Sequence, residues 1–100
     1  MDNNALTTDQ LNRLRKLISI AMRAQDDFVL RFVYRDRKGQ RTRRTVSPIR
    51  FIGQGENESF SALCICREEV RQFVLAKCSE PVLVRAWEVL MPVEIETVDE

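Results

Sequence analysis

The chain has 100 residues and a mass of 11.7 kDa, which matches one domain and excludes a multidomain enzyme. Its composition, 44% hydrophobic and 31% charged, predicts a folded globular protein rather than a disordered one. Histidine is absent, which removes the commonest general base, the serine and cysteine triads that use imidazole, and most zinc sites. We therefore predict that the chain is not an enzyme and has no catalytic residues, no metal site and no cofactor.

The formal net charge of +1 conceals an uneven distribution of charged residues. Residues 31–50 carry eight basic side chains against one acidic side chain, a local net charge of +7. Residues 93–100 carry four acidic side chains and no base. Because a local cluster of positive charge attracts polyanions even in a near-neutral chain, an anionic partner stays compatible with this composition.

The cysteines and the N-terminus predict a reduced, cytoplasmic protein. The first ten residues are polar and lack the features of a signal peptide. The chain contains three cysteines, which is an odd number. No apolar run approaches the ~20 residues that span a bilayer, so we expect no membrane association. Cys64 and Cys66 have the spacing of one strand face, which favours two small buried side chains over metal ligands.

The N-terminal quarter predicts a short polar lead followed by one amphipathic helix that runs to about Gln25. Thr8 or Asp9 is the expected N-cap. Apolar residues recur at spacings of three and four, and Arg15 falls with the other basic residues on the opposite, solvated face. The apolar positions are Leu11, Leu14, Leu17, Ile18, Ala21 and Met22.

From Phe28 the apolar period changes to two, which predicts strands. A strand from Phe28, a turn in which Gly39 takes positive φ, and a second strand over about 41–47 predict a hairpin that Pro48 closes. Further strands are expected over 50–52, 59–66, 69–75 and 82–85. Residues 93–98 are expected to form either an edge strand whose carboxylates prevent further strand pairing or a surface that binds a second copy of the chain.

One helix followed by short strands and tight turns predicts a mainly β fold with an N-terminal α-helix, in the form of a small, strongly bent sheet or barrel. We divide the chain into a lead and capping helix (1–25), a β-barrel core (26–86) and a C-terminal segment (87–100). The last segment is expected to pack or to pair as an edge strand before an acidic, frayed end.

Strand parity places two arginines on the core-facing side of the predicted sheet. If Val46 faces the core, so does Arg44, which is two residues before it on the same strand. Arg71 lies on the same face of its own predicted strand as the apolar residues of that strand. Burying a guanidinium without a partner is costly. Each arginine must therefore reach the barrel mouth, meet a carboxylate such as Glu69 or Glu58, or bind an anionic ligand, and periodicity leaves these alternatives open.

Two motifs in a fixed order identify a family resemblance. An R-x-V-x-P segment at 44–48 and an R-x-E-x-R-x-F segment at 67–73, at their spacing from Tyr34 and Gly39, closely resemble the WYL domain. This is a bacterial family named for a Trp-Tyr-Leu tripeptide, and the resemblance covers roughly residues 18–78. The tripeptide itself is degenerate here, because its place falls on Glu58, Ser59 and Phe60, and the D-R that usually follows the last strand reads Ala76-Lys77.

The resemblance implies an Sm-like, SH3-like small β-barrel that senses nucleic-acid or nucleotide-like ligands in transcription regulation or defence. Arginine has a planar fork of donors that fits phosphate, and aromatic rings stack bases, which agrees with that implication. The residues expected to hold phosphate are Arg44 and Arg71, supported by Arg67 and Lys77. Those expected to stack or shape the site are Tyr34 and Phe60. The peripheral basic residues expected to steer a phosphate chain are Arg37, Lys38, Arg41 and Arg43.

We therefore expect a stand-alone, ligand-sensing regulatory module that binds a phosphate-bearing ligand, either single-stranded nucleic acid or a nucleotide. The alternative is a protein-interaction or dimerisation module in which the barrel is a scaffold and residues 87–98 form the contact, with a homo-oligomer or a regulator protein as the partner.

Overall fold

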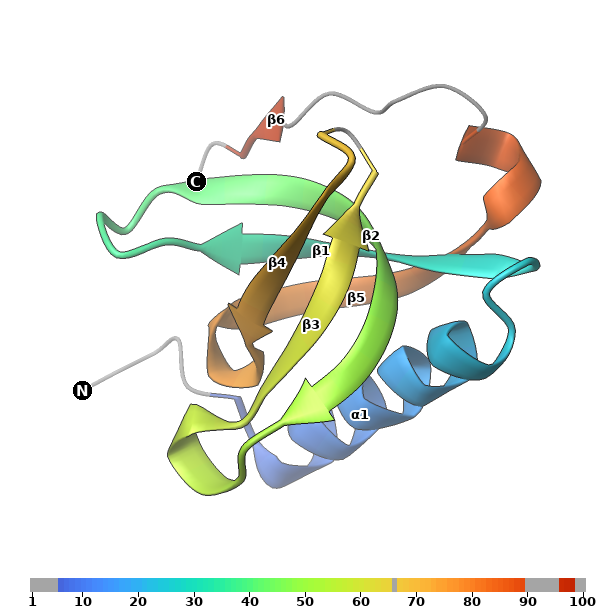
Figure 1. The fold of residues 1–100 in the computed structure, drawn as a ribbon. Helices are drawn as coiled ribbons and strands as arrows, with labels where there is room; N and C mark the ends of the chain where they lie inside the picture. Colours follow the sequence, from blue (N-terminus) through green and yellow to red (C-terminus); the bar gives the residue numbers. More distant parts are fainter. Residues whose placement is uncertain (1–5, 66, 90–95, 99–100) are drawn as a thin grey trace.

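The computed structural model describes residues 6–65, 67–89 and 96–98 (Figure 1). The helix and strands are α1 (Thr8–Arg23), β1 (Phe28–Arg35), β2 (Arg41–Ile52), β3 (Ser59–Cys64), β4 (Glu69–Val74), β5 (Cys78–Arg85) and β6 (Glu96–Thr97). Three short 3₁₀ helices are η1 (Gly55–Asn57), η2 (Leu75–Lys77) and η3 (Ala86–Val89). Of the helices that the structure describes, none has both the length and the apolarity to cross a bilayer.

Helix α1 begins one residue earlier than the sequence predicts, because its N-cap is Thr7 rather than Thr8 or Asp9. The Gln10 backbone N–H donates to Thr7 Oγ1 at 3.1 Å, and the Thr7 N–H donates to Gln10 Oε1 at 2.8 Å. This reciprocal pair is a capping box, and it needs glutamine or glutamate three residues after the cap. Only Thr7 has that spacing to Gln10.

The predicted hairpin of β1 and β2 is confirmed. Gly39 has a φ of +81°, and its N–H donates to the Asp36 carbonyl at 3.0 Å. The Asp36 side chain accepts hydrogen bonds from the backbone N–H groups of Lys38 and Gln40, both at 2.9 Å. The turn is therefore held by its own aspartate, as expected for Asx-type turn chemistry.

Strand β2 does not end at Pro48, as the sequence analysis predicted, but continues to Ile52. The pairing of β2 with β3 shifts register between Pro48 and Arg50, which leaves Ile49 as an extra residue. A bulge accommodates a residue without a backbone N–H, and it also bends the strand. Figure 1 shows this bend in β2, which turns its two halves onto different parts of the sheet.

The strands form an antiparallel sheet in the order β4-β3-β2-β1-β5, with β6 attached to β2. Across the described residues no ladder joins β4 to β5. Of the two predicted forms, a strongly bent sheet or a barrel, the structure shows the first: an open, strongly curved sheet (Figure 1). Where β4 approaches β1, the Val74 N–H is taken by the Tyr34 hydroxyl instead of a strand carbonyl. This contact between β4 and β1 is thus made by a side chain and not by a backbone ladder.

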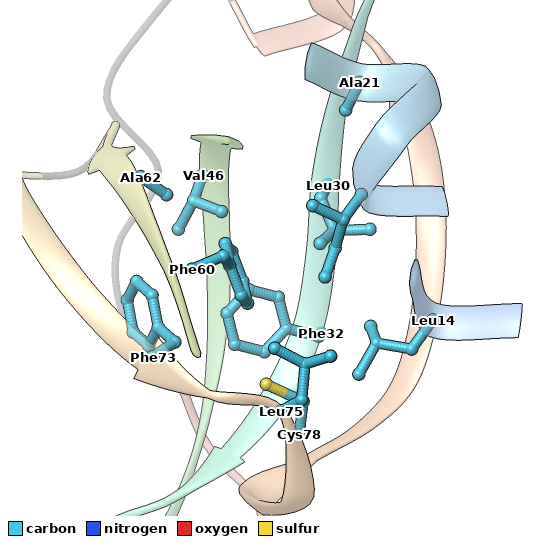
Figure 2. Packing of buried hydrophobic residues seen from close by; sticks show 11 residues of the cluster. Leu14, Ala21, Leu30, Phe32, Val46, Phe60, Ala62, Phe73, Leu75 and Cys78 are labelled. Atoms are coloured by element: carbon cyan, nitrogen blue, oxygen red, sulfur yellow. The ribbon is translucent and has the colours of Figure 1, made fainter. Parts of the chain in front are cut away.

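The core lies on the concave face of this sheet, with α1 packed against one side of it (Figure 2). Phe32, Phe60 and Phe73 come from three different strands and meet in the centre, and Leu14 of α1 is buried beside them. A further tie joins the helix to the sheet, because the Arg15 guanidinium binds both oxygens of Glu58, at 2.6–3.1 Å. Arg15 is therefore not a purely solvated residue, and Glu58 is not the partner of Arg44 or Arg71.

The capping box can be tested by comparing two variants at neighbouring positions. We expect Thr7→Ala to lower the free energy of unfolding by about 0.5–2 kcal/mol, because it removes the acceptor for the Gln10 N–H. Thr8→Ala, one residue later, leaves the cap intact and is expected to change stability by less than about 0.5 kcal/mol. Urea unfolding followed by circular dichroism measures both, and equal losses in the two variants would contradict the assignment of the cap.

Candidate functional site

The candidate site lies on the concave face between β4 and the β1–β2 hairpin. We define it by Tyr34 of β1, Thr42 and Arg44 of β2, and Glu69 and Arg71 of β4. In the strand register Arg44 is opposite the buried Phe32, and Arg71 is opposite the buried Ala62. Residues directly opposite each other in a sheet point to the same face. The predicted core-facing parity of both arginines is therefore confirmed.

Arg44 is held by its own strand but has an incomplete set of partners. Its Nε donates to Thr42 Oγ1 at 3.0 Å. Its Nη1 is buried and has no hydrogen-bond partner among the residues that the structure describes. A buried, unpaired donor on a charged group is costly, so the Arg44 Nη1 has an N–H free to donate to an additional acceptor oxygen.

Arg71 meets a carboxylate, which is one of the alternatives that the sequence left open. Its Nη1 lies 3.5 Å from Glu69 Oε1, and the two side chains are 40% and 52% exposed. Exposed ion pairs contribute only about 0–1 kcal/mol. Arg71 can therefore exchange Glu69 for another anion at little cost.

Tyr34 joins the two arginines to the aromatic core. Its ring packs edge-on against Phe73, with centroids 5.0 Å apart. Its hydroxyl accepts the Val74 N–H at 3.1 Å. Burial raises the pKa of Tyr34, and the positive charges of Arg44 and Arg71 act in the opposite direction. Both guanidinium groups thus lie close enough to the phenol to influence its ionisation.

Phe60 has no exposed surface, although the sequence analysis expected it to stack or shape the site. It packs with Phe32 and Phe73 at centroid distances of 5.9 and 5.6 Å. A fully buried ring cannot stack on a base without a rearrangement of the core. Of the two predicted roles, only shaping the floor of the site is compatible with this position.

The two supporting basic residues are separated along β4. Arg67 lies in the turn before β4, and Lys77 lies in η2 after it. Both are exposed. A strand of six residues is about 20 Å long, so Arg67 and Lys77 flank the site at opposite ends instead of meeting at one phosphate.

The predicted peripheral residues belong to the hairpin, and two of them already have close neighbours. Arg41 forms an ion pair with Glu80 at 3.0 Å, and Arg43 is in register with Glu96 of β6. Both alternate with Thr42 and Arg44 along the strand, so they lie on the opposite face of β2. Arg37 and Lys38 are exposed at the turn.

Two contributions to the site were missed by the sequence analysis. The bond from Arg44 to Thr42 was accessible in principle, since residues two apart on a strand share a face. The contact between Tyr34 and Val74 was not, because it depends on how far the sheet curls.

Apart from the candidate site, a pocket with a volume of about 410 Å³ lies between the start of α1 and β5, and no sequence pattern pointed to it. It is lined by Leu6, Gln10, Arg13, Leu14, Cys78, Ser79, Glu80, Pro81 and Val82. Burial raises the pKa of the Cys78 thiol well above its ordinary value, so this cysteine is an inert part of the wall. Cys66 is outside the described residues, and the described part of the chain has no cluster of three potential metal ligands.

The curved antiparallel sheet with a leading helix and two arginines on its concave face defines a small β domain with an anion-compatible site. The family model of the WYL domain matches residues 16–81. The chain belongs to the WYL domain family, which confirms the resemblance predicted from the motifs at 44–48 and 67–73. This membership supports a regulatory, ligand-sensing module.

Among solved structures the chain is similar to "Proteasome accessory factor B/C (PafBC) of Arthrobacter aurescens", with a TM-score of 0.63 and 22% sequence identity. The match covers 79% of this chain and 12% of that chain. At this identity the similarity shows the fold, and the chain corresponds to a small part of that protein. The comparison with curated proteins found no match.

Tyr34 is the only tyrosine, so its ionisation can be followed by ultraviolet absorbance and tests the geometry of the site directly. We expect a pKa above the ordinary value of 10.0 in the folded protein. The neutral phenol is favoured by folding, so its stabilising contribution is present below the unfolded pKa and is lost as the pH rises through the folded one. Tyr34→Phe is expected to lack this loss of stability at alkaline pH.

The same titration locates the two arginines. Arg44→Gln and Arg71→Gln are each expected to raise the pKa of Tyr34 further, because each removes a positive charge that favours the phenolate. Arg37→Gln, at the exposed turn, serves as the control of equal charge. If all three variants shift the titration equally, the two arginines do not have the proximity to Tyr34 that the structure shows.

Proposed function

We propose that this chain is a cytoplasmic, ligand-sensing regulatory module that binds a phosphate-bearing ligand at the site formed by Tyr34, Arg44 and Arg71. The ligand class is single-stranded nucleic acid or a nucleotide. The observation that carries the proposal is the buried Nη1 of Arg44, which has no partner among the described residues. An anionic oxygen at this position would supply the missing acceptor and form a charge-assisted hydrogen bond.

Phosphate suits this site better than a carboxylate does. A phosphate group has several acceptor oxygens, so it can bind Arg44 and Arg71 together, and guanidinium groups match it with two parallel donors. Glu69 would have to release Arg71, and the exposure of this pair makes that exchange inexpensive. The site then gains a ligand that bridges β2 and β4.

The nucleic-acid part of the proposal rests on Tyr34 and on the hairpin. Tyr34 is only half-buried, whereas Phe60 and Phe73 have almost no exposed surface, so Tyr34 is the ring of this cluster that a base can reach. Arg37 and Lys38 are exposed at the turn and would steer a phosphate chain towards the site. Recognition would thus depend mainly on the phosphate backbone.

The fold and the family membership agree with this role. The strand order β4-β3-β2-β1-β5 behind a leading helix supports an Sm-like relationship for the open sheet. WYL domains are regulatory, and we propose that this domain acts through a partner protein or by sequestering its ligand.

A protein-interaction module that uses residues 87–98 is the second candidate. Trp87 is 65% exposed, the largest exposed fraction among the large apolar side chains of the described residues. Tryptophan is enriched at the energetic centres of interfaces. Under this alternative, Trp87→Ala would reduce self-association or partner capture in light scattering and would leave phosphate binding unchanged.

Binding to a short oligothymidylate and to a nucleoside triphosphate tests the first proposal. We expect either probe to raise the melting temperature of the wild-type protein. Arg44→Ala and Arg71→Ala should each weaken binding by about 10- to 100-fold, the effect of losing one hydrogen bond to a charged group. Arg23→Ala removes an exposed charge from the end of α1 and is the matched control that should retain binding.

Salt dependence and intrinsic stability supply the remaining controls. Removing one phosphate contact should reduce the slope of log K against log salt by about one. Arg44→Met keeps most of the aliphatic stem and removes the unpaired donor, so it should melt at the same or a higher temperature than the wild type without ligand. If the wild type binds neither probe while the circular dichroism spectrum shows it folded, the proposal is wrong.

A further inference from the structure

The N-terminal half of β2 has an edge that β3 does not cover. The ladder between β2 and β3 begins at Val46, which pairs with Cys64 at the end of β3. Beyond it, in the described part of the chain, the Ile65 N–H donates to the Thr45 carbonyl. β2 nevertheless extends to Arg41. Its first residues therefore present a row of backbone groups that another extended segment can bind.

In this structure the edge is occupied by the C-terminal strand β6, which lies beside β2 on the side of the sheet away from α1 (Figure 1). Thr42 pairs with Thr97, and Arg43 pairs with Glu96. The Val98 N–H donates to the Arg41 carbonyl at 3.0 Å. The contact is antiparallel, and among the described residues it comprises two residue pairs, which makes this part short enough to open while the rest of the sheet persists.

The edge and the candidate ligand site share one residue. Thr42 pairs through its backbone with β6, and through its hydroxyl it accepts the hydrogen bond from Arg44 Nε. Displacing or docking β6 therefore acts on the residue that orients the Arg44 guanidinium. A ligand held by Arg44 would act on the same residue from the concave side.

The charges of the two segments are complementary. Residues 41–44 contain three arginines, and residues 93–100 contain four acidic residues and no base. The positive potential that attracts a phosphate chain also attracts this acidic segment. The C-terminal segment and an anionic ligand are thus attracted by the same positive potential, next to Arg44.

We propose that the β2 edge from Arg41 to Arg44 is a docking edge for an acidic extended segment, that its occupant is the chain's own C-terminal strand β6, and that this docking competes with phosphate-ligand binding at Arg44. The competition rests on the function proposed above. The protein then exists in a β6-docked state of low ligand affinity and a β6-released state of high affinity, and the ligand shifts the balance towards the second.

A matched pair of variants in the full chain tests this competition. Val98→Pro removes the N–H that donates to the Arg41 carbonyl, whereas Val98→Ala shortens the same side chain and keeps that donor. With oligothymidylate as the probe, Val98→Pro should bind about tenfold more tightly than Val98→Ala, the factor expected if β6 is docked in about nine molecules of ten. Amide exchange at Val98 in the wild type should also become faster when the probe is added.

The outcomes separate this inference from the proposed function. If Val98→Pro and Val98→Ala bind equally and Val98 exchange is unchanged by the probe, while Arg44→Ala still loses binding, the competition is wrong and the phosphate site stands. If the wild type and both Val98 variants bind no probe at all although they are folded, the phosphate site is wrong as well. Should Val98→Pro fail to fold, the exchange of Val98 in the wild type decides between competition and independence.

Discussion

Phe32 contacts three other aromatic rings at the centre of the concave face, and these contacts set the curvature of the sheet. Its centroid lies 6.2 Å from that of Tyr34, 5.9 Å from that of Phe60 and 5.2 Å from that of Phe73. Phe73 belongs to β4, which is three places from β1 in the strand order. Because rings this close must be in contact, the sheet has to curl until β4 faces β1. Arg71, two residues before Phe73, is then carried into the neighbourhood of Tyr34.

This curvature explains why a domain of this size keeps a partly buried arginine. The apolar centre and α1 together fill one part of the concave face, and the remainder is left to Arg44, Arg71 and the Tyr34 hydroxyl. The Nη1 of Arg44 has no hydrogen-bond partner in the described part of the fold, so its burial lowers the stability of the folded state. Residues that lower stability without an internal partner are typical of sites that bind something else, since selection keeps them for the bound state.

Much of the site was predictable because strand parity is a local property. Alternation alone placed Arg44 and Arg71 on the core-facing side, and the glycine in Asp36–Gly39 predicted the hairpin turn. Most of the failures are long-range. The bulge after Pro48, the opening of the barrel beside Tyr34 and the pairing of β6 with β2 depend on contacts between distant residues, which no local pattern encodes. The N-cap was misplaced for a local reason, because the glutamine that completes the capping box was not considered.

The three residues at the altered tripeptide position all have structural roles in this chain. Glu58 is engaged by Arg15 of the helix, the Ser59 hydroxyl donates to the Asn57 carbonyl at 2.8 Å, and Phe60 is buried in the core. All three residues therefore serve the fold, and none of them presents a free polar group or an exposed ring to the concave face. Of the residues expected to hold a ligand, those that remain on the concave face are two guanidinium groups and one phenol. Under the function proposed above, such a set would select a ligand by its phosphate groups and would discriminate little between bases.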